Sequence, residues 1–134
     1  DNQHVEPACV AMERGYDVLL EKPIAKHEDE LKRIYDISVR TGKRAAVCHV
    51  LRYTRFFNTL KAIIDSGEIG ELVNITHSEN IGYWHMAHSF VRGNWRREDE
   101  TSPMILAKSC HDTDILLYLV GKDCKRVASF GDFF

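Results

Sequence analysis

The chain has 134 residues, of which 44% are hydrophobic, and a formal net charge of −2 at pH 7, values typical of an ordinary globular protein. Positive and negative charges are interspersed rather than gathered in a basic stretch, so we expect no nucleic acid as a partner. No apolar run reaches the roughly 20 residues that span a bilayer, and residues 1–4 lack the plan of a signal peptide, so we expect a cytoplasmic protein with no membrane partner.

The cysteines and the two ends of the chain bear on its class. Cys9, Cys48, Cys110 and Cys124 are widely spaced and form no Cys-x-x-Cys motif, so we expect reduced thiols that mostly pack in the interior. The sequence opens without Met close to an apparent helix and ends on the apolar residues 130–134. We therefore expect an internal fragment of a longer protein.

Residues 1–49 alternate between helical and strand patterns. Apolar residues at helical spacing predict a helix over residues 4–14 that stops at Gly15, followed by a short strand over 17–20 buried on both faces. Acidic residues at 28–30 predict the start of a helix that stops at Thr41-Gly42, and residues 45–48 predict the next strand. Short connections between such elements indicate a doubly wound α/β sheet, of which these residues are too few to bury a core alone.

The pattern changes after His49. Thr54 predicts the cap of a helix that stops at Gly67, and residues 71–78 predict a strand. Residues 80–100 are rich in aromatics, histidines and arginines without a clean period, which indicates a binding loop or a poorly predicted edge. Ser102-Pro103 predicts the start of a helix that runs to Val120 and stops at Gly121, and residues 126–130 predict a further strand.

The tripeptide Glu21-Lys22-Pro23 is the sharpest chemical feature. It follows a predicted buried strand, and ligands of open α/β sheets gather at the carboxyl ends of strands. Lys22 could therefore reach a cofactor crevice. The alternative is a solvated turn in which Pro23 merely ends the strand.

His111 is a second candidate, because it lies on a predicted apolar helix and shares a face with Asp114 and Tyr118. A histidine titrates near neutrality and could act as a general base. The alternative is a core histidine with a hydrogen-bonding neighbour. His77, His85 and His88 form a third cluster, but no acidic or cysteine ligand completes it, so we expect no metal site.

The order and spacing of these pieces resemble the Gfo/Idh/MocA oxidoreductase family, which groups glucose–fructose oxidoreductase and inositol dehydrogenase. The resemblance runs through nearly the whole chain and is carried by His4, residues 14–23, Arg52-Tyr53, residues 66–71, Asn94-Trp95-Arg96 and residues 111–114. It implies that residues 1–49 are the C-terminal part of a Rossmann-type, dinucleotide-binding parallel sheet. Residues 50–134 would then begin an α+β substrate domain with a mostly antiparallel open sheet.

The resemblance also implies an activity and a set of roles. The parent enzyme would transfer a hydride between NAD or NADP and a sugar, polyol or related carbohydrate, and would be a homo-oligomer, either dimer or tetramer. Lys22 would hydrogen-bond the reacting oxygen, and His111 would exchange its proton. The implied cofactor-binding residues are Asp1, Asn2, His4, Glu21, Lys22, Pro23 and Arg52. The implied substrate residues are Tyr83, Trp84, His85, His88, Arg92, Asn94, Trp95, Arg96, Lys108 and His111.

The sequence departs from the family's pattern in two places. Many relatives carry an Asp four residues before the catalytic histidine, where this chain has Ala107 followed by Lys108, which could be a second cation near the substrate or a solvated helix lysine. The glycine-rich phosphate loop of the family is nowhere in the 134 residues, so we expect the fragment itself to be inactive. The alternatives are an NAD-dependent glycoside hydrolase of the same family and a non-catalytic binding or assembly module.

Overall fold

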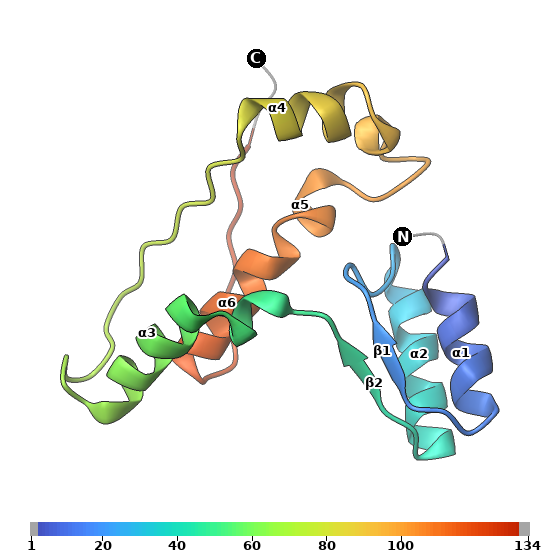
Figure 1. Ribbon diagram of the computed structural model, residues 1–134, viewed down its shortest axis with the longest axis horizontal. Coiled ribbons are helices and arrows are strands. Elements are labelled where there is room, and N and C mark those ends of the chain that lie inside the picture. Colours follow the sequence, from blue (N-terminus) through green and yellow to red (C-terminus); the bar gives the residue numbers. More distant parts are fainter. Residues whose placement is uncertain (1–2, 132–134) are drawn as a thin grey trace.

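The computed structural model describes residues 3–131 (Figure 1). Its N-terminal part comprises α1 (Val5–Glu13), β1 (Val18–Leu20), α2 (Glu28–Thr41) and β2 (Ala45–Val47). The two strands pair in parallel, with Val18 opposite Ala45 and Leu20 opposite Val47. The α/β pattern expected for this part is therefore confirmed as a small parallel sheet with α1 and α2 packed together beside it.

Local sequence signals account for where these elements begin and end. Glu30 accepts a hydrogen bond from the backbone N–H of the N-cap residue His27 at 3.2 Å, as in a capping box, and another from the preceding Lys26 at 3.0 Å. Gly42 ends this helix in the left-handed conformation, with φ of 68°. The sequence therefore sets the bounds of α2 at both ends.

A single apolar core unites the N-terminal elements. It is formed by residues of α1, β1, α2 and the loop after β1, namely Val5, Ala8, Cys9, Met12, Leu20, Ala25, Ile34 and Ile37. The expectation that β1 is buried on both faces is wrong, because Leu19 is 75% exposed. Helices cover one face of this sheet, and no described segment covers the other at Leu19.

The C-terminal part is built around a helix pair. It contains η1 (Val50–Tyr53), α3 (Arg55–Ser66), α5 (Met104–Ala107) and α6 (Cys110–Val120), with α3 and η1 packed against α6. Thr54 caps α3 as expected, since its hydroxyl accepts a hydrogen bond from the Phe57 N–H at 3.4 Å. None of the helices in residues 3–131 is both long and apolar enough to cross a bilayer.

Residues 80–100, for which no regular element was predicted, are largely helical. They form α4 (Tyr83–His85), a π-helical turn η2 (Met86–Val91) and a 3₁₀ turn η3 (Asn94–Arg96). The mixture of α, π and 3₁₀ turns explains why the sequence shows no single helical period here.

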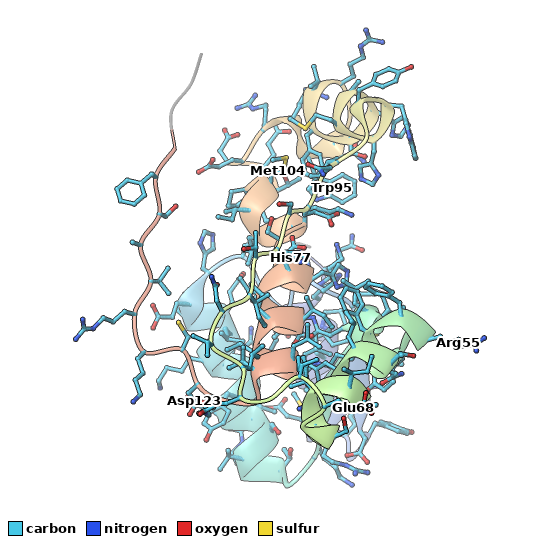
Figure 2. The ribbon with its side chains drawn as sticks, turned by 90° about the vertical axis from the view of Figure 1, so that its left-hand side faces the viewer. Arg55, Glu68, His77, Trp95, Met104 and Asp123 are labelled. Atoms are coloured by element: carbon cyan, nitrogen blue, oxygen red, sulfur yellow. The ribbon has the colours of Figure 1, made fainter. Side chains whose placement is uncertain are left out.

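The strands predicted at 71–78 and 126–130 do not form in the structure. Both segments are extended and run separately along the molecule (Figures 1 and 2), and the described residues give neither a strand partner. A strand needs a neighbour to accept and donate its ladder hydrogen bonds, so β-branched composition alone does not produce one. The accessible surface of 10,486 Å² accordingly exceeds the roughly 7,200 Å² expected of a compact protein of this mass.

The cysteines are free thiols, as expected, but they differ in burial. Cys9 is 1% exposed in the core and Cys48 and Cys110 are partly buried, whereas Cys124 is exposed, so the expected packing in the interior does not extend to Cys124. Cys124 lies on the extended C-terminal segment, where few side chains cover it.

Candidate active site

Lys22 lies in the turn that follows β1. The preceding Glu21 is exposed, and its carboxylate accepts a hydrogen bond from the Lys22 N–H at 3.1 Å. His4, at the start of α1, donates from Nδ1 to the Pro23 carbonyl at 2.8 Å. The N-terminal part therefore holds the turn from both sides and directs the lysine toward the C-terminal part.

The Lys22 ammonium reaches across the molecule to α5, where Nζ donates to the Ala107 carbonyl at 2.6 Å. In an uninterrupted helix this carbonyl would accept from the His111 N–H, which instead donates to Lys108 at 3.3 Å. The predicted single helix over 102–120 is therefore wrong: it breaks at Lys108–Ser109, where α5 ends and α6 begins. The bond from Lys22 stabilises the break because it satisfies a carbonyl that the helix leaves free.

The break places His111 in the first turn of α6, beside Lys22 and Lys108. Burial lowers the pKa of His111 below its ordinary value of 6.5, and the nearby charges of Lys22, His49 and Lys108 lower it further. His111 is therefore neutral at pH 7 and can accept a proton. Burial likewise raises the pKa of the neighbouring Cys110 thiol, which stays protonated and is no nucleophile.

Lys22 and His111 line one cavity of about 280 Å³. Predicted substrate residues from two separate segments, His85, Trp95 and Lys108, share this lining. The remaining lining residues are Pro23, Ser89, Phe90 and Ala107. Ser89 and Phe90 had not been singled out from the sequence, because they lie in the segment without a helical period.

A second hollow adjoins the cavity and shares Ser89 and Trp95 with it. Four more predicted substrate residues line it: Trp84, His88, Arg92 and Asn94. Tyr83 is 87% exposed, and Arg96 is exposed with its guanidinium 3.5 Å from the Gly93 carbonyl, so neither lines these two spaces. Asp1 and Asn2 lie outside the described residues.

His49, at the end of β2, is a site residue that the sequence analysis did not single out. Its ring packs edge to face against that of His111, with centroids 6.1 Å apart and an interplanar angle of 79°. The Nδ1 atoms of both rings are buried without a hydrogen-bond partner among the described residues. The rule that ligands gather at the carboxyl ends of strands, applied to Lys22, would also have indicated His49.

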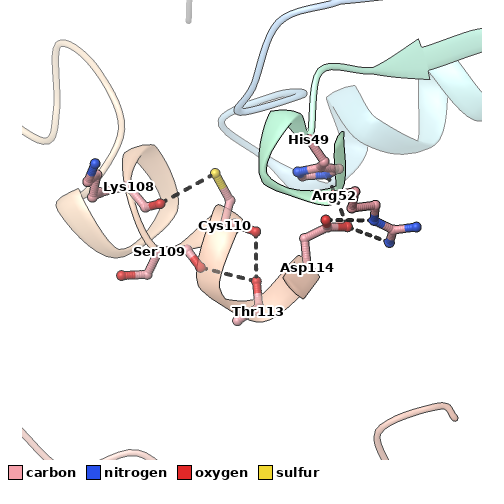
Figure 3. Close-up of polar contacts among 7 residues, drawn as sticks. All are labelled: His49, Arg52, Lys108, Ser109, Cys110, Thr113 and Asp114. Carbon is pink, nitrogen blue, oxygen red and sulfur yellow. Dashed lines mark hydrogen bonds and ion pairs between the residues drawn. The ribbon is translucent and has the colours of Figure 1, made fainter. Parts of the chain in front are cut away.

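Arg52, predicted to bind the cofactor, pairs with a carboxylate of α6. Its Nε and Nη2 donate to Asp114 at 2.8 and 2.6 Å (Figure 3). The guanidinium also lies 5.2 Å from the centre of the Tyr118 ring. The Asp114 carboxylate raises the already high pKa of Arg52. Two parallel bonds to one carboxylate fix η1 against α6 and so fix His49 beside His111.

Three side chains on the other flank of α6 have a spacing that could hold a cation. Ligand atoms of His77, Glu79 and Asp112 lie within 4.8 Å of one another. Direct pairing accounts for this cluster, because His77 Nε2 and Asp112 share a hydrogen bond of 2.8 Å and Lys108 Nζ lies 3.7 Å from Glu79. His85 and His88, considered with His77 from the sequence, are not part of the cluster.

A larger cleft of about 370 Å³ lies between the turn after β1 and α6. It shares Lys22 with the cavity, includes His49 at the end of β2, and is otherwise lined mainly by apolar side chains of residues 23–31 and of α5 and α6. An apolar cleft with a few polar groups, one of them an unpaired imidazole nitrogen, suits a flat aromatic ring such as nicotinamide. The diphosphate of a dinucleotide would need donors that the 134 residues do not supply as a glycine-rich loop.

Two models of one protein family match the chain. The model described as "Oxidoreductase family, NAD-binding Rossmann fold" matches residues 1–49, and that described as "Oxidoreductase family, C-terminal alpha/beta domain" matches residues 61–132. Both belong to the Gfo/Idh/MocA family.

Curated relatives and solved structures agree with these matches. The chain is 31% identical over 123 residues to inositol 2-dehydrogenase of Pseudomonas fluorescens, covering 90% of the chain and 33% of that protein. It is 33% identical over 115 residues to inositol 2-dehydrogenase of Burkholderia vietnamiensis, covering 84% of the chain and 31% of that protein. The crystal structure of myo-inositol 2-dehydrogenase from Lactobacillus plantarum is similar in fold, with a TM-score of 0.73 and 22% identity over 90% of the chain and 35% of that structure. The chain thus spans about a third of the length of these relatives.

Proposed function

Because the chain belongs to the Gfo/Idh/MocA oxidoreductase family, we propose that it supplies the active-site lysine and histidine of an NAD(P)-dependent oxidoreductase. The enzyme transfers a hydride between the nicotinamide and a sugar, polyol or related carbohydrate. Inositol 2-dehydrogenases among the relatives support a polyhydroxyl substrate.

One observation carries the proposal: Lys22 and His111, far apart in sequence, line the same cavity. Lys22 donates a hydrogen bond to the reacting hydroxyl oxygen and stabilises negative charge that develops there. His111, neutral at pH 7, accepts the hydroxyl proton during oxidation and returns it during reduction. Bound NAD or NADP would supply the hydride acceptor, so that the alcohol carbon is oxidised to a carbonyl and the nicotinamide is reduced.

The domain boundary near residue 49 is part of the proposal. Residues 1–49 contribute the turn that carries Lys22, and residues 50–134 contribute His111 and the remaining cavity walls. The 134 residues do not include the glycine-rich loop that binds a dinucleotide diphosphate, so they are inactive alone. The intact enzyme, a name used below for a protein that combines these residues with such a loop, is a cytoplasmic homo-oligomer.

The test replaces Lys22 by Met in the intact enzyme, which removes the charge and keeps most of the side-chain volume. We expect the rate of NAD(P)H formation with myo-inositol, a neutral cyclic polyol, to fall by about 10²- to 10⁴-fold, because a preorganised cation at the reacting oxygen is lost. Lys125→Met is the matched control, since Lys125 is exposed on the extended C-terminal segment, away from the cavity. Equal rates in Lys22→Met and Lys125→Met would remove the catalytic assignment.

A non-catalytic module is the second candidate, favoured by Ala107, which leaves no carboxylate four residues before His111. It predicts no reduction of NAD or NADP by the intact enzyme with any polyol or sugar. The glycoside hydrolase alternative predicts glycosidic cleavage without net formation of reduced nucleotide. Product analysis of the same reactions therefore separates all three.

A further inference from the structure

We infer that the substrate carries a carboxylate and that the ammonium of Lys108 binds it, so that the enzyme prefers a sugar acid to a neutral sugar or polyol. This inference rests on the proposed function and adds the chemical class of the substrate and the residue that selects it.

The charge of the cavity is the first observation. Two lysines, Lys22 and Lys108, line it and carry its positive charge, and none of its lining residues is Asp or Glu. A space of about 280 Å³ with cationic walls and no carboxylate favours an anionic ligand, because the fixed charges attract it and suppress neutral competitors. A neutral polyol would offer these charges no counterion of its own.

Two acidic residues of α6 are engaged elsewhere. Asp112 shares a hydrogen bond of 2.8 Å with His77, which lies on the extended segment (Figure 2). Asp114 binds Arg52 through both of its oxygens. Neither carboxylate therefore neutralises the lysines of the cavity.

The ammonium groups of the two lysines differ in how firmly other groups of the protein hold them. Lys22 Nζ is held by the Ala107 carbonyl at 2.6 Å, a neutral acceptor that fixes the ammonium without cancelling its charge. Lys108 Nζ lies 3.7 Å from Glu79 Oε1, which is too long for a hydrogen bond. The Glu79 side chain is 40% exposed and that of Lys108 is 28% exposed, so this pair is weak and a substrate carboxylate can displace Glu79.

The backbone places Lys108 where it can bind one end of a substrate while Lys22 and His111 act on the other. Lys108 ends α5 at the break, and His111 lies one turn further along the chain in α6. Ala107, next to Lys108, presents no side-chain carboxylate that would repel an anion. Lys22 and His111 are committed to the hydroxyl that reacts, so Lys108 is the one additional cation among the lining residues. One additional positive charge matches a carboxylate better than a phosphate dianion.

The test compares a panel of sugar acids, including D-glucuronate and D-gluconate, with neutral myo-inositol and with glucose 6-phosphate in the intact enzyme. For the preferred acid we expect Lys108→Met to lower the ratio of kcat/KM between acid and myo-inositol by about 10- to 100-fold, the effect of one charge-assisted hydrogen bond. Lys108→Arg should retain most of the ratio, because it keeps the positive charge. Lys125→Met is the control for loss of a lysine outside the cavity.

Glu79→Gln should have the opposite effect to Lys108→Met, and it removes no positive charge from the cavity. It takes away the carboxylate that competes for Lys108, so the KM for the sugar acid should fall by about two- to fivefold, in line with a weak, partly exposed ion pair. Binding of the acid to the enzyme with NAD bound, measured by calorimetry, should tighten by the same factor and weaken in Lys108→Met. Calorimetry does not depend on turnover.

The outcomes separate this inference from the proposed function. Turnover of myo-inositol with no acid bound or preferred, or an acid-to-neutral ratio unchanged in Lys108→Met, overturns the carboxylate assignment and leaves the oxidoreductase standing. A preference for glucose 6-phosphate also overturns it. Calorimetric binding of an acid that needs Lys108, without reduction of NAD or NADP by any substrate, supports the carboxylate site and overturns the oxidoreductase proposal.

Discussion

The ion pair between Arg52 and Asp114 joins segments 62 residues apart, and Asp114→Asn tests how much it stabilises the site. The substitution keeps the shape of the side chain but removes its charge and turns one acceptor oxygen into a donor that faces the guanidinium. We expect η1 and α6 to lose their fixed alignment, and with it the contact between His49 and His111.

The magnitude follows from burial. The Asp114 side chain is 10% exposed and accepts two bonds of 2.8 and 2.6 Å, whereas the Arg52 side chain is 39% exposed. Removing one partner of a fully buried pair costs about 3 to 5 kcal/mol. Solvent around Arg52 screens the interaction, so we expect about 2 kcal/mol, or roughly a 30-fold rise in the population of the locally open state.

Hydrogen exchange of the α6 amides in the intact enzyme measures this local free energy of opening directly. Asp36→Asn is the matched control, because Asp36 forms an exposed pair with Lys32 on α2 and should change exchange by less than about 0.5 kcal/mol. A double-mutant cycle with Arg52→Met isolates the pair itself. If Asp114→Asn alters α6 exchange no more than Asp36→Asn alters that of α2, the pair does not hold the site together.

Two further predictions concern protonation and core packing. Since burial and then Lys22, His49 and Lys108 lower the pKa of His111 below 6.5, the base stays neutral as pH falls through 6.5, and kcat/KM for oxidation should decline only at lower pH. Lys108→Met removes one of these positive neighbours and should move the declining limb of the pH profile upward; a wild-type limb centred at or above 6.5 would contradict the reasoning. Met12→Ala should lower the free energy of opening of the α1 amides by about 3 kcal/mol, because Met12 is 0% exposed in the core. A loss under about 1 kcal/mol would mean that this core is loosely packed.

Interactions close in sequence were predictable. The stops at Gly42, Gly67 and Gly121 follow from the ease with which glycine adopts the left-handed conformation, with φ of 68°, 76° and 65° at these positions. The cap at Thr54 and the alternation of helix and strand over residues 1–49 follow from side chains within a few positions of one another.

Long-range contacts decided the rest. β-branched residues at 71–78 favour a strand, but a ladder needs a partner that the described residues do not provide. Local signals favour one helix over 102–120, yet an ammonium 85 residues away binds the Ala107 carbonyl and stabilises a break there.

The sequence by itself determined the chemistry available to this protein: a lysine after a strand, a histidine on a helix, and aromatic and basic side chains between them. Tertiary structure decided which of these side chains share a space, and it paired Arg52 with Asp114 from a distant segment. The physical reason is that capping and periodicity act over a few residues, whereas a cavity depends on where distant backbone groups find their hydrogen-bond partners.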